Sequence, residues 1–178
     1  YRGFLWNKIF ERRIFFDSNG EAHLLNDELR ICEDLLFVVE AAKRCEYFYY
    51  DDRCFYNYIQ WEGSAYNGRF HYGKLSEIVA YNLIMKIISE EMPECRPQYE
   101  QAYLNMALKL RDSYFQLPGW KRDSRCGICI EHAVRRFYSE LMKRCDISIK
   151  KKFFYFIYRK CPRLIRRIKN IHHKVVYR

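Results

Sequence analysis

The chain has 178 residues, a formal net charge of +10 at pH 7 and an aromatic content of 18%. This length can bury a core of its own, and no apolar run reaches the roughly 18 residues that a membrane-spanning helix needs. The eight cysteines are scattered along the sequence, which favours reduced thiols and a cytoplasmic protein over a disulfide framework.

The first part of the chain predicts short strands around one helix. A strand is expected over residues 5–10, and an apolar run that starts with two acids predicts a helix over residues 33–44. Two tyrosine-rich strands are expected over residues 47–50 and 54–59, because aromatic residues are enriched in strands. This pattern is typical of an α+β arrangement.

The pattern then becomes helical. Apolar residues at helical spacing predict helices over residues 75–91, 99–115 and 127–145. Pro93 and Pro97 are expected to stop the first of these helices, since proline cannot continue a helix from its interior. We therefore expect a mainly helical C-terminal part.

The positive charge is concentrated at the C-terminus. Residues 147–178 hold 11 basic residues and no acidic one, whereas the rest of the chain holds 21 basic and 22 acidic residues. On a helical wheel most apolar residues of this tail fall on one side and most arginines on the other, which is typical of a helix lying on an anionic membrane. The residues expected at the membrane are Lys150, Lys151, Lys152, Phe153, Phe154, Ile157, Arg159, Lys160, Arg163, Arg166 and Arg167.

Two other interpretations of this tail stay open. Its apolar side could pack on the body of the protein and leave the charges in solvent. Its charges could also bind nucleic acid, but the sequence contains no recognised nucleic-acid-binding module, so no nucleic-acid partner is predicted.

Glu33 and Asp34 are candidates for acid–base chemistry, because they begin the predicted helix over residues 33–44. A carboxylate can take the proton of a sugar hydroxyl as that hydroxyl attacks an anomeric carbon, and a helix N-terminus favours the anionic form. The alternative interpretation is that the two are ordinary first-turn acids, which are common in any helix.

The segments before and after the Glu33-Asp34 pair resemble those of a known protein family. Trp6-Asn7-Lys8 precedes it, and the tyrosine-rich strands and Ser64 follow it. This order resembles the acceptor side of family 2 (GT-A type) glycosyltransferases of the bacterial polysaccharide-building kind. The resemblance implies that Asp34 is the catalytic base and Glu33 its partner, and that Trp6, Asn7, Lys8 and Ser64 bind substrate. His71 is a candidate for a position near the donor metal.

The resemblance also implies a fold and a set of partners. The expected fold is the C-terminal half of a GT-A-type α/β domain over residues 1–73, a helical extension over residues 74–146 and the basic tail over residues 147–178. The donor would be a nucleotide sugar, and the acceptor a hydroxyl of a glycan or of a lipid-linked sugar at the inner face of the membrane. Mg²⁺ or Mn²⁺ would be held by an upstream Asp-x-Asp motif that this chain lacks, so we expect the chain alone to be inactive.

A function of another class remains as the alternative. The chain could be a non-catalytic helical module that binds a membrane or a protein through its basic tail.

Overall fold

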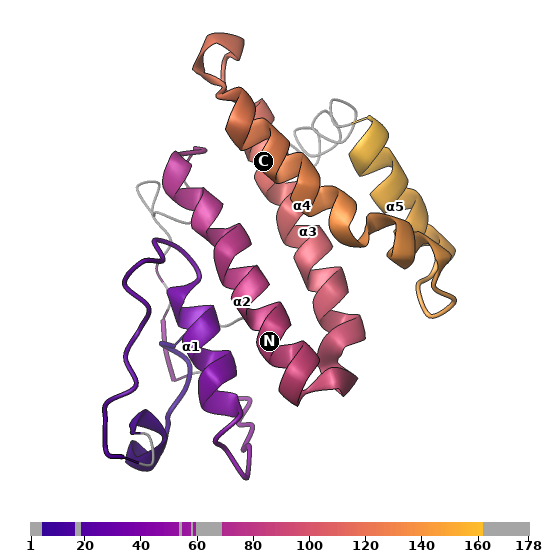
Figure 1. Cartoon of the computed structure of the whole chain (residues 1–178). Helices are drawn as coiled ribbons and strands as arrows, with labels where there is room; N and C mark the ends of the chain where they lie inside the picture. The colour runs from indigo at the N-terminus through magenta and orange to yellow at the C-terminus, as the bar shows by residue number, and fades with distance from the viewer. Residues whose placement is uncertain (1–4, 17–18, 54, 58, 60–68, 162–178) are drawn as a thin grey trace. The chain divides into compact units, whose positions relative to one another are not determined.

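The structure, a computed structural model, describes residues 5–16, 19–53, 55–57, 59 and 69–161. The chain divides into two compact units, Tyr1–Arg96 and Pro97–Arg178, and the described part of the chain, taken together, is mainly helical (Figure 1). The first unit contains the elements η1 Arg12–Phe15, α1 Glu33–Ala42, η2 Tyr72–Leu75, α2 Ser76–Glu91 and η3 Pro93–Cys95. The second unit contains α3 Arg96–Phe115, η4 Gly119–Lys121, α4 Ser124–Lys143 and α5 Ile149–Lys160.

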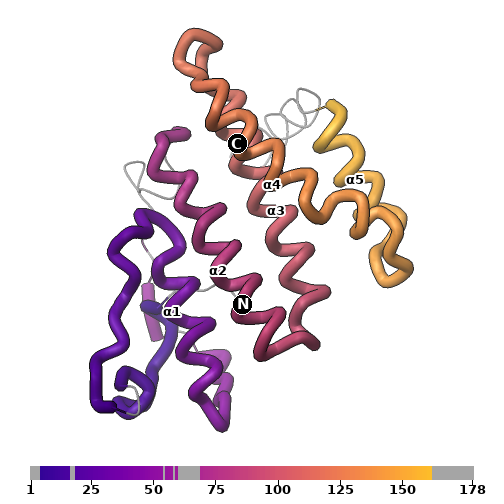
Figure 2. The backbone as a smooth tube through the Cα atoms, viewed as in Figure 1, coloured from indigo at the N-terminus to yellow at the C-terminus, as the bar shows by residue number. Residues whose placement is uncertain are grey.

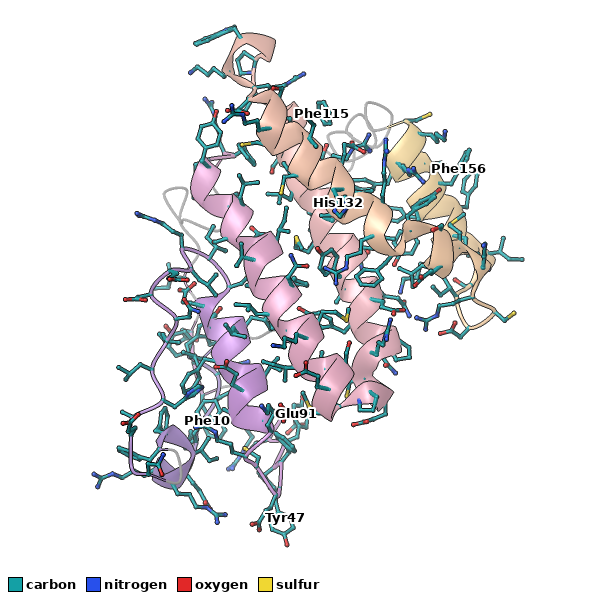
Figure 3. The ribbon with its side chains drawn as sticks, viewed as in Figure 1. Phe10, Tyr47, Glu91, Phe115, His132 and Phe156 are labelled. Carbon is teal, nitrogen blue, oxygen red and sulfur yellow. The ribbon has the colours of Figure 1, made fainter. Side chains whose placement is uncertain are left out.

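Helices α1 and α2 of the first unit run side by side in the same direction (Figure 2). Near their beginnings, the hydroxyl of Ser76 accepts hydrogen bonds from the backbone before α1. At their C-terminal ends, Lys43 Nζ lies 2.5 Å from Glu91 Oε1, and Figure 3 labels Glu91 at the last turn of α2. The two helices therefore present their N-terminal ends at the same end of the unit.

The ring of Phe37 is the centre of the core that covers α1. It lies 6.0 Å from the ring of Phe10, 5.6 Å from that of Phe15 and 5.4 Å from that of His23, measured between ring centroids. Phe10 is labelled beside α1 in Figure 3. These aromatic contacts join the segment before α1 to the helix, because each buried ring contributes a large apolar area.

The prediction of an α+β fold with a half GT-A domain is wrong. None of the strands expected over residues 5–10, 47–50 and 54–59 forms in the described residues, where the strand-like pairing is one isolated antiparallel bridge between Phe16 and Ala22. A strand is stable only when a neighbour completes its hydrogen bonds, and the preference of tyrosine for strands reflects packing within a sheet. The side chains of residues 47–50 have no such sheet and are 68–92% exposed.

The described part of the second unit contains the α-helices α3, α4 and α5, and α3 runs antiparallel to α4. The ring of Tyr103 packs edge-on against that of Phe137, with ring centroids 5.0 Å apart. Arg144, directly after the end of α4, donates from Nη1 to Glu100 Oε2 near the start of α3 at 3.2 Å. Two N-caps hold the later helices. The Asp123 side chain accepts from the backbone N–H groups of residues 125 and 126, and Ser148 accepts from that of residue 151.

Helix α5 packs with its tyrosine side inward. Tyr155 and Tyr158 are buried, and Arg111 on α3 donates from Nη1 to the backbone oxygens of Tyr158 and Arg159 at 3.4 and 3.0 Å. These are among the last carbonyls of α5, which have no partner within the helix. In the described ranges, no helix combines the length and the apolar character needed to cross a bilayer.

Candidate functional site

The candidate site lies where α1 and α2 begin. Ser76, the first residue of α2, accepts hydrogen bonds at its Oγ from the backbone N–H of Arg30 at 3.2 Å and of Ile31 at 3.0 Å. The same hydroxyl lies 2.8 Å from the backbone oxygen of Gly73, to which it donates. Since Ser76 holds the segment that leads into α1, it fixes the first turn of α1 relative to α2.

Cys32 turns the chain into α1. Its φ is 70°, in the left-handed region that an L residue with a side chain rarely adopts. Burial, together with the nearby charges of Glu77, Asp34 and Glu33, raises the pKa of the Cys32 thiol to about 12. The thiol therefore stays protonated near neutral pH and is not the nucleophile of this site, because thiolates rather than thiols are reactive.

Asp34 is a half-buried carboxyl in the first turn of α1. Its Oδ1 accepts a hydrogen bond from the backbone N–H of Leu35 at 2.7 Å. Burial raises the pKa of Asp34 above its ordinary value, the hydrogen bond from Leu35 opposes this rise, and the neighbouring charge of Glu33 adds to it. A carboxylate with a raised pKa is a stronger base, so the environment of Asp34 suits proton abstraction.

Lys8 lies close enough to Asp34 for each to affect the other. The ammonium of Lys8 lowers the pKa of Asp34, and Asp34 raises that of Lys8 against a larger lowering by burial. Lys8 Nζ also donates to Asn7 Oδ1 at 2.8 Å. The structure therefore brings the predicted basic segment and the predicted base to one place.

Glu33 contributes a second carboxyl to the site. Its Oε2 is buried and accepts no hydrogen bond from any part of the chain that the structure describes. A buried carboxylate oxygen normally has a hydrogen-bond partner, since leaving one unpaired costs roughly 1–3 kcal/mol. Because this oxygen is buried, the structure gives it no direct contact with a hydroxyl outside the protein.

Two charged residues of the site were missed by the sequence interpretation. Lys74 is only 6% exposed, and burial lowers its pKa while the charge of Glu77 opposes this change. Glu77 also contributes to the raised pKa of the Cys32 thiol, which places its carboxylate near the first turn of α1. The only sequence signal for Glu77 was its place as a first-turn acid of a predicted helix. Nothing in the sequence linked it to a helix more than 40 residues earlier.

The predicted substrate-binding residues are partly brought together. The ring of Trp6 stacks on that of Tyr56, with centroids 4.7 Å apart and planes inclined by 27°. The segment of Trp6, Asn7 and Lys8 thus meets one of the tyrosine-rich segments on one side and Asp34 on the other. Ser64 lies outside the described residues.

The described residues do not form a metal centre. His71 is exposed just before η2, and no group of three or more histidine, cysteine, aspartate or glutamate side chains in the described ranges could hold a metal ion. A Mg²⁺ or Mn²⁺ ion would need carboxylate ligands from elsewhere.

The predicted membrane residues lie on α5 as far as Lys160. Arg163, Arg166 and Arg167 lie outside the described residues.

Comparisons with known proteins do not assign the chain to a family. No family model matches the chain, and no curated protein and no solved structure matches it.

Proposed function

We propose that this chain is the acceptor-side part of an inverting glycosyltransferase, which moves a sugar from a nucleotide-sugar donor to a hydroxyl of a glycan or lipid-linked acceptor. The observation that carries the proposal is the carboxyl of Asp34, half-buried at the start of α1, with a raised pKa and with Lys8 beside it. The order of Trp6-Asn7-Lys8, Glu33-Asp34 and the tyrosine-rich segments adds the resemblance to family 2 glycosyltransferases.

Asp34 is the base in this proposal. As the acceptor oxygen attacks the anomeric carbon of the donor sugar, its proton passes to the Asp34 carboxylate and the nucleoside diphosphate leaves with the bonding electrons. The attack comes from the face opposite the leaving group, so the anomeric configuration inverts. Lys8 keeps Asp34 in the anionic form that can accept the proton.

The aromatic pair positions the acceptor, and Glu33 supports the base. The neighbouring charge of Glu33 adds to the raised pKa of Asp34. The stacked rings of Trp6 and Tyr56 are 38% and 53% exposed, and offer an aromatic surface to the apolar face of a sugar ring. These contacts would fix the acceptor before transfer, which removes part of the entropic barrier.

The donor is not assigned to the described residues. They hold no group of three metal ligands, so the diphosphate and its Mg²⁺ or Mn²⁺ would be held by a part of the enzyme outside them. When bound, such an ion would stabilise the charge that develops on the leaving diphosphate.

The full-length protein provides the test. It would be incubated with a panel of nucleotide sugars, with Mg²⁺ or Mn²⁺ and with glycan or lipid-linked acceptors, and release of nucleoside diphosphate would be measured. Acceptor-dependent release and NMR evidence of an inverted anomeric centre are expected. Release with none of the donors, or a product with retained configuration, would contradict the proposal.

A further inference from the structure

The outward side of α5 carries a row of exposed apolar side chains. Ile149, Phe153 and Phe156 are 85%, 62% and 46% exposed, and their spacing of four and then three residues places them on one side of the helix. The buried Tyr155 and Tyr158 lie on the other side. Figure 3 labels Phe156 on the side of α5 that faces away from α4.

Basic side chains surround this row. Lys150 and Lys160 are exposed, and Lys152 is half-buried. No acidic residue occurs from Ile147 to the end of the chain. The side of α5 that faces solvent therefore combines apolar and positively charged groups, as in helices that lie in the membrane interface.

We propose that this face of α5, defined by Ile149, Phe153, Phe156, Lys150 and Lys160, binds the surface of an anionic phospholipid membrane. The proposal goes beyond sugar transfer and does not depend on it, since it rests on residues of the second unit alone. The three apolar side chains enter the boundary between headgroups and acyl chains, while the lysines extend to the lipid phosphates.

The packing of α5 makes this face available without any rearrangement of the helix. Tyr155 and Tyr158 attach the inward side, Arg111 holds the last carbonyls, and the guanidinium of Arg159 lies 4.1 Å from the ring centroid of Tyr138. Arg159 is thus engaged within the unit and is not among the lipid-binding residues that we assign. The helix presents an already formed surface, so binding does not bear the cost of ordering it.

The chemistry of the face favours lipid over nucleic acid. An aliphatic side chain such as Ile149 cannot stack on a base, whereas it gains free energy on entering hydrocarbon. Helix α5 has 12 residues, fewer than the roughly 20 that a membrane-spanning helix needs, so the proposal has it lie along the membrane surface.

The test uses the full chain and sedimentation with two kinds of vesicle, phosphatidylcholine alone and phosphatidylcholine mixed with phosphatidylserine. One variant combines Phe153→Ser and Phe156→Ser, which removes apolar area without changing charge. Its control combines Trp120→Ser and Ile128→Ser, which remove exposed apolar side chains of the same unit outside α5, at 82% and 70% exposure. Far-ultraviolet circular dichroism checks that each variant is folded.

We expect the wild type to bind the anionic vesicles and to bind the neutral ones much less. The phenylalanine variant should lose at least about tenfold in the partition coefficient, because two buried aromatic side chains contribute more than this. The control should bind like the wild type. Lys150→Gln with Lys160→Gln should also weaken binding, by about fivefold for each charge.

Three results would overturn the proposal. The first is equal binding of wild type and phenylalanine variant, and the second is equal binding to neutral and anionic vesicles. The third is failure to bind vesicles together with binding of a labelled single-stranded oligonucleotide, because the face would then be a nucleic-acid surface. None of these readouts involves sugar transfer, so failure here is distinct from failure of the proposed function.

Discussion

At the scale of single residues, two opposing influences act on the pKa of Asp34. The helix N-terminus and Lys8 favour its charged form, and burial favours the neutral one. Burial is the larger effect, so the folded chain has a higher pKa at Asp34 than the unfolded chain. Asp34 therefore contributes stability below the pKa of the unfolded state, and this contribution is lost as pH rises through the folded pKa.

Replacement of Asp34 by Asn removes this pH dependence. Relative to wild type, the free energy of unfolding of Asp34→Asn should increase from acidic to neutral pH, so that the variant gains relative stability, as measured by urea unfolding at several pH values. Asp27→Asn, at an exposed position in the same unit, is the control. A relative stability of Asp34→Asn that falls over this pH range would show that the carboxylate is stabilised by the fold.

Lys8 offers a second test at this scale. Lys8→Gln removes a positive charge that lowers the pKa of Asp34, so the pKa of Asp34 should rise further. NMR titration of the Asp34 carboxyl carbon measures this directly. Arg13→Gln, which removes an exposed charge paired with Glu11, should leave the titration of Asp34 where it is. An unchanged titration of Asp34 in Lys8→Gln would show that the charge of Lys8 does not affect the pKa of Asp34.

At the scale of elements, the helices could be predicted because their apolar periodicity is local. The helix expected over residues 75–91 is found as Ser76–Glu91, and Pro93 follows it as expected. Pro97 was expected to stop a helix but lies in the first turn of α3, where proline has no hydrogen bond to lose. The strands could not be predicted in the same way, because a strand depends on a partner that need not be near in sequence.

The parallel pairing of α1 and α2 depends on one hydroxyl at its start. Ser76→Ala removes the acceptor of two backbone hydrogen bonds before α1, and we expect a loss of about 1–2 kcal/mol in the free energy of unfolding, measured with urea. Ser89→Ala, at an exposed position of the same helix, should change stability by no more than a few tenths of a kcal/mol. Equal effects of the two substitutions would argue against the role of Ser76.

The attachment of α5 depends on Arg111. Arg111→Met removes the donors to the last carbonyls of α5 and the ion pair with Glu131. We expect a loss of about 2 kcal/mol and faster hydrogen exchange of the α5 amides than of the α3 amides. Arg135→Met, at an exposed position of α4, is the control. Exchange that is unchanged in α5 would mean that the tyrosines alone hold the helix.

At the scale of the whole molecule, the site and the lipid-binding face belong to different units and are tested separately. The sequence placed Asp34, Glu33 and Lys8 among the site residues, because they are close in sequence to recognisable blocks. It did not indicate Glu77 and Lys74, since only the parallel pairing of α1 and α2 brings Glu77 near Cys32 at the start of α1, with Lys74 near Glu77. It also did not indicate that Tyr155 and Tyr158 form the buried side of α5, and it placed Ile157, which is half-buried, among the outward residues.

The central claim is the proposal that Asp34 is the base of a sugar transfer. The most direct test measures the turnover of Asp34→Asn in the full-length protein together with the affinity of this variant for the donor. Asp27→Asn is the matched control, which should keep full turnover. We predict that Asp34→Asn lowers turnover by at least about 100-fold while donor binding is retained, because a general base contributes about that much or more. Turnover equal to that of the control, with a folded protein, would contradict the account.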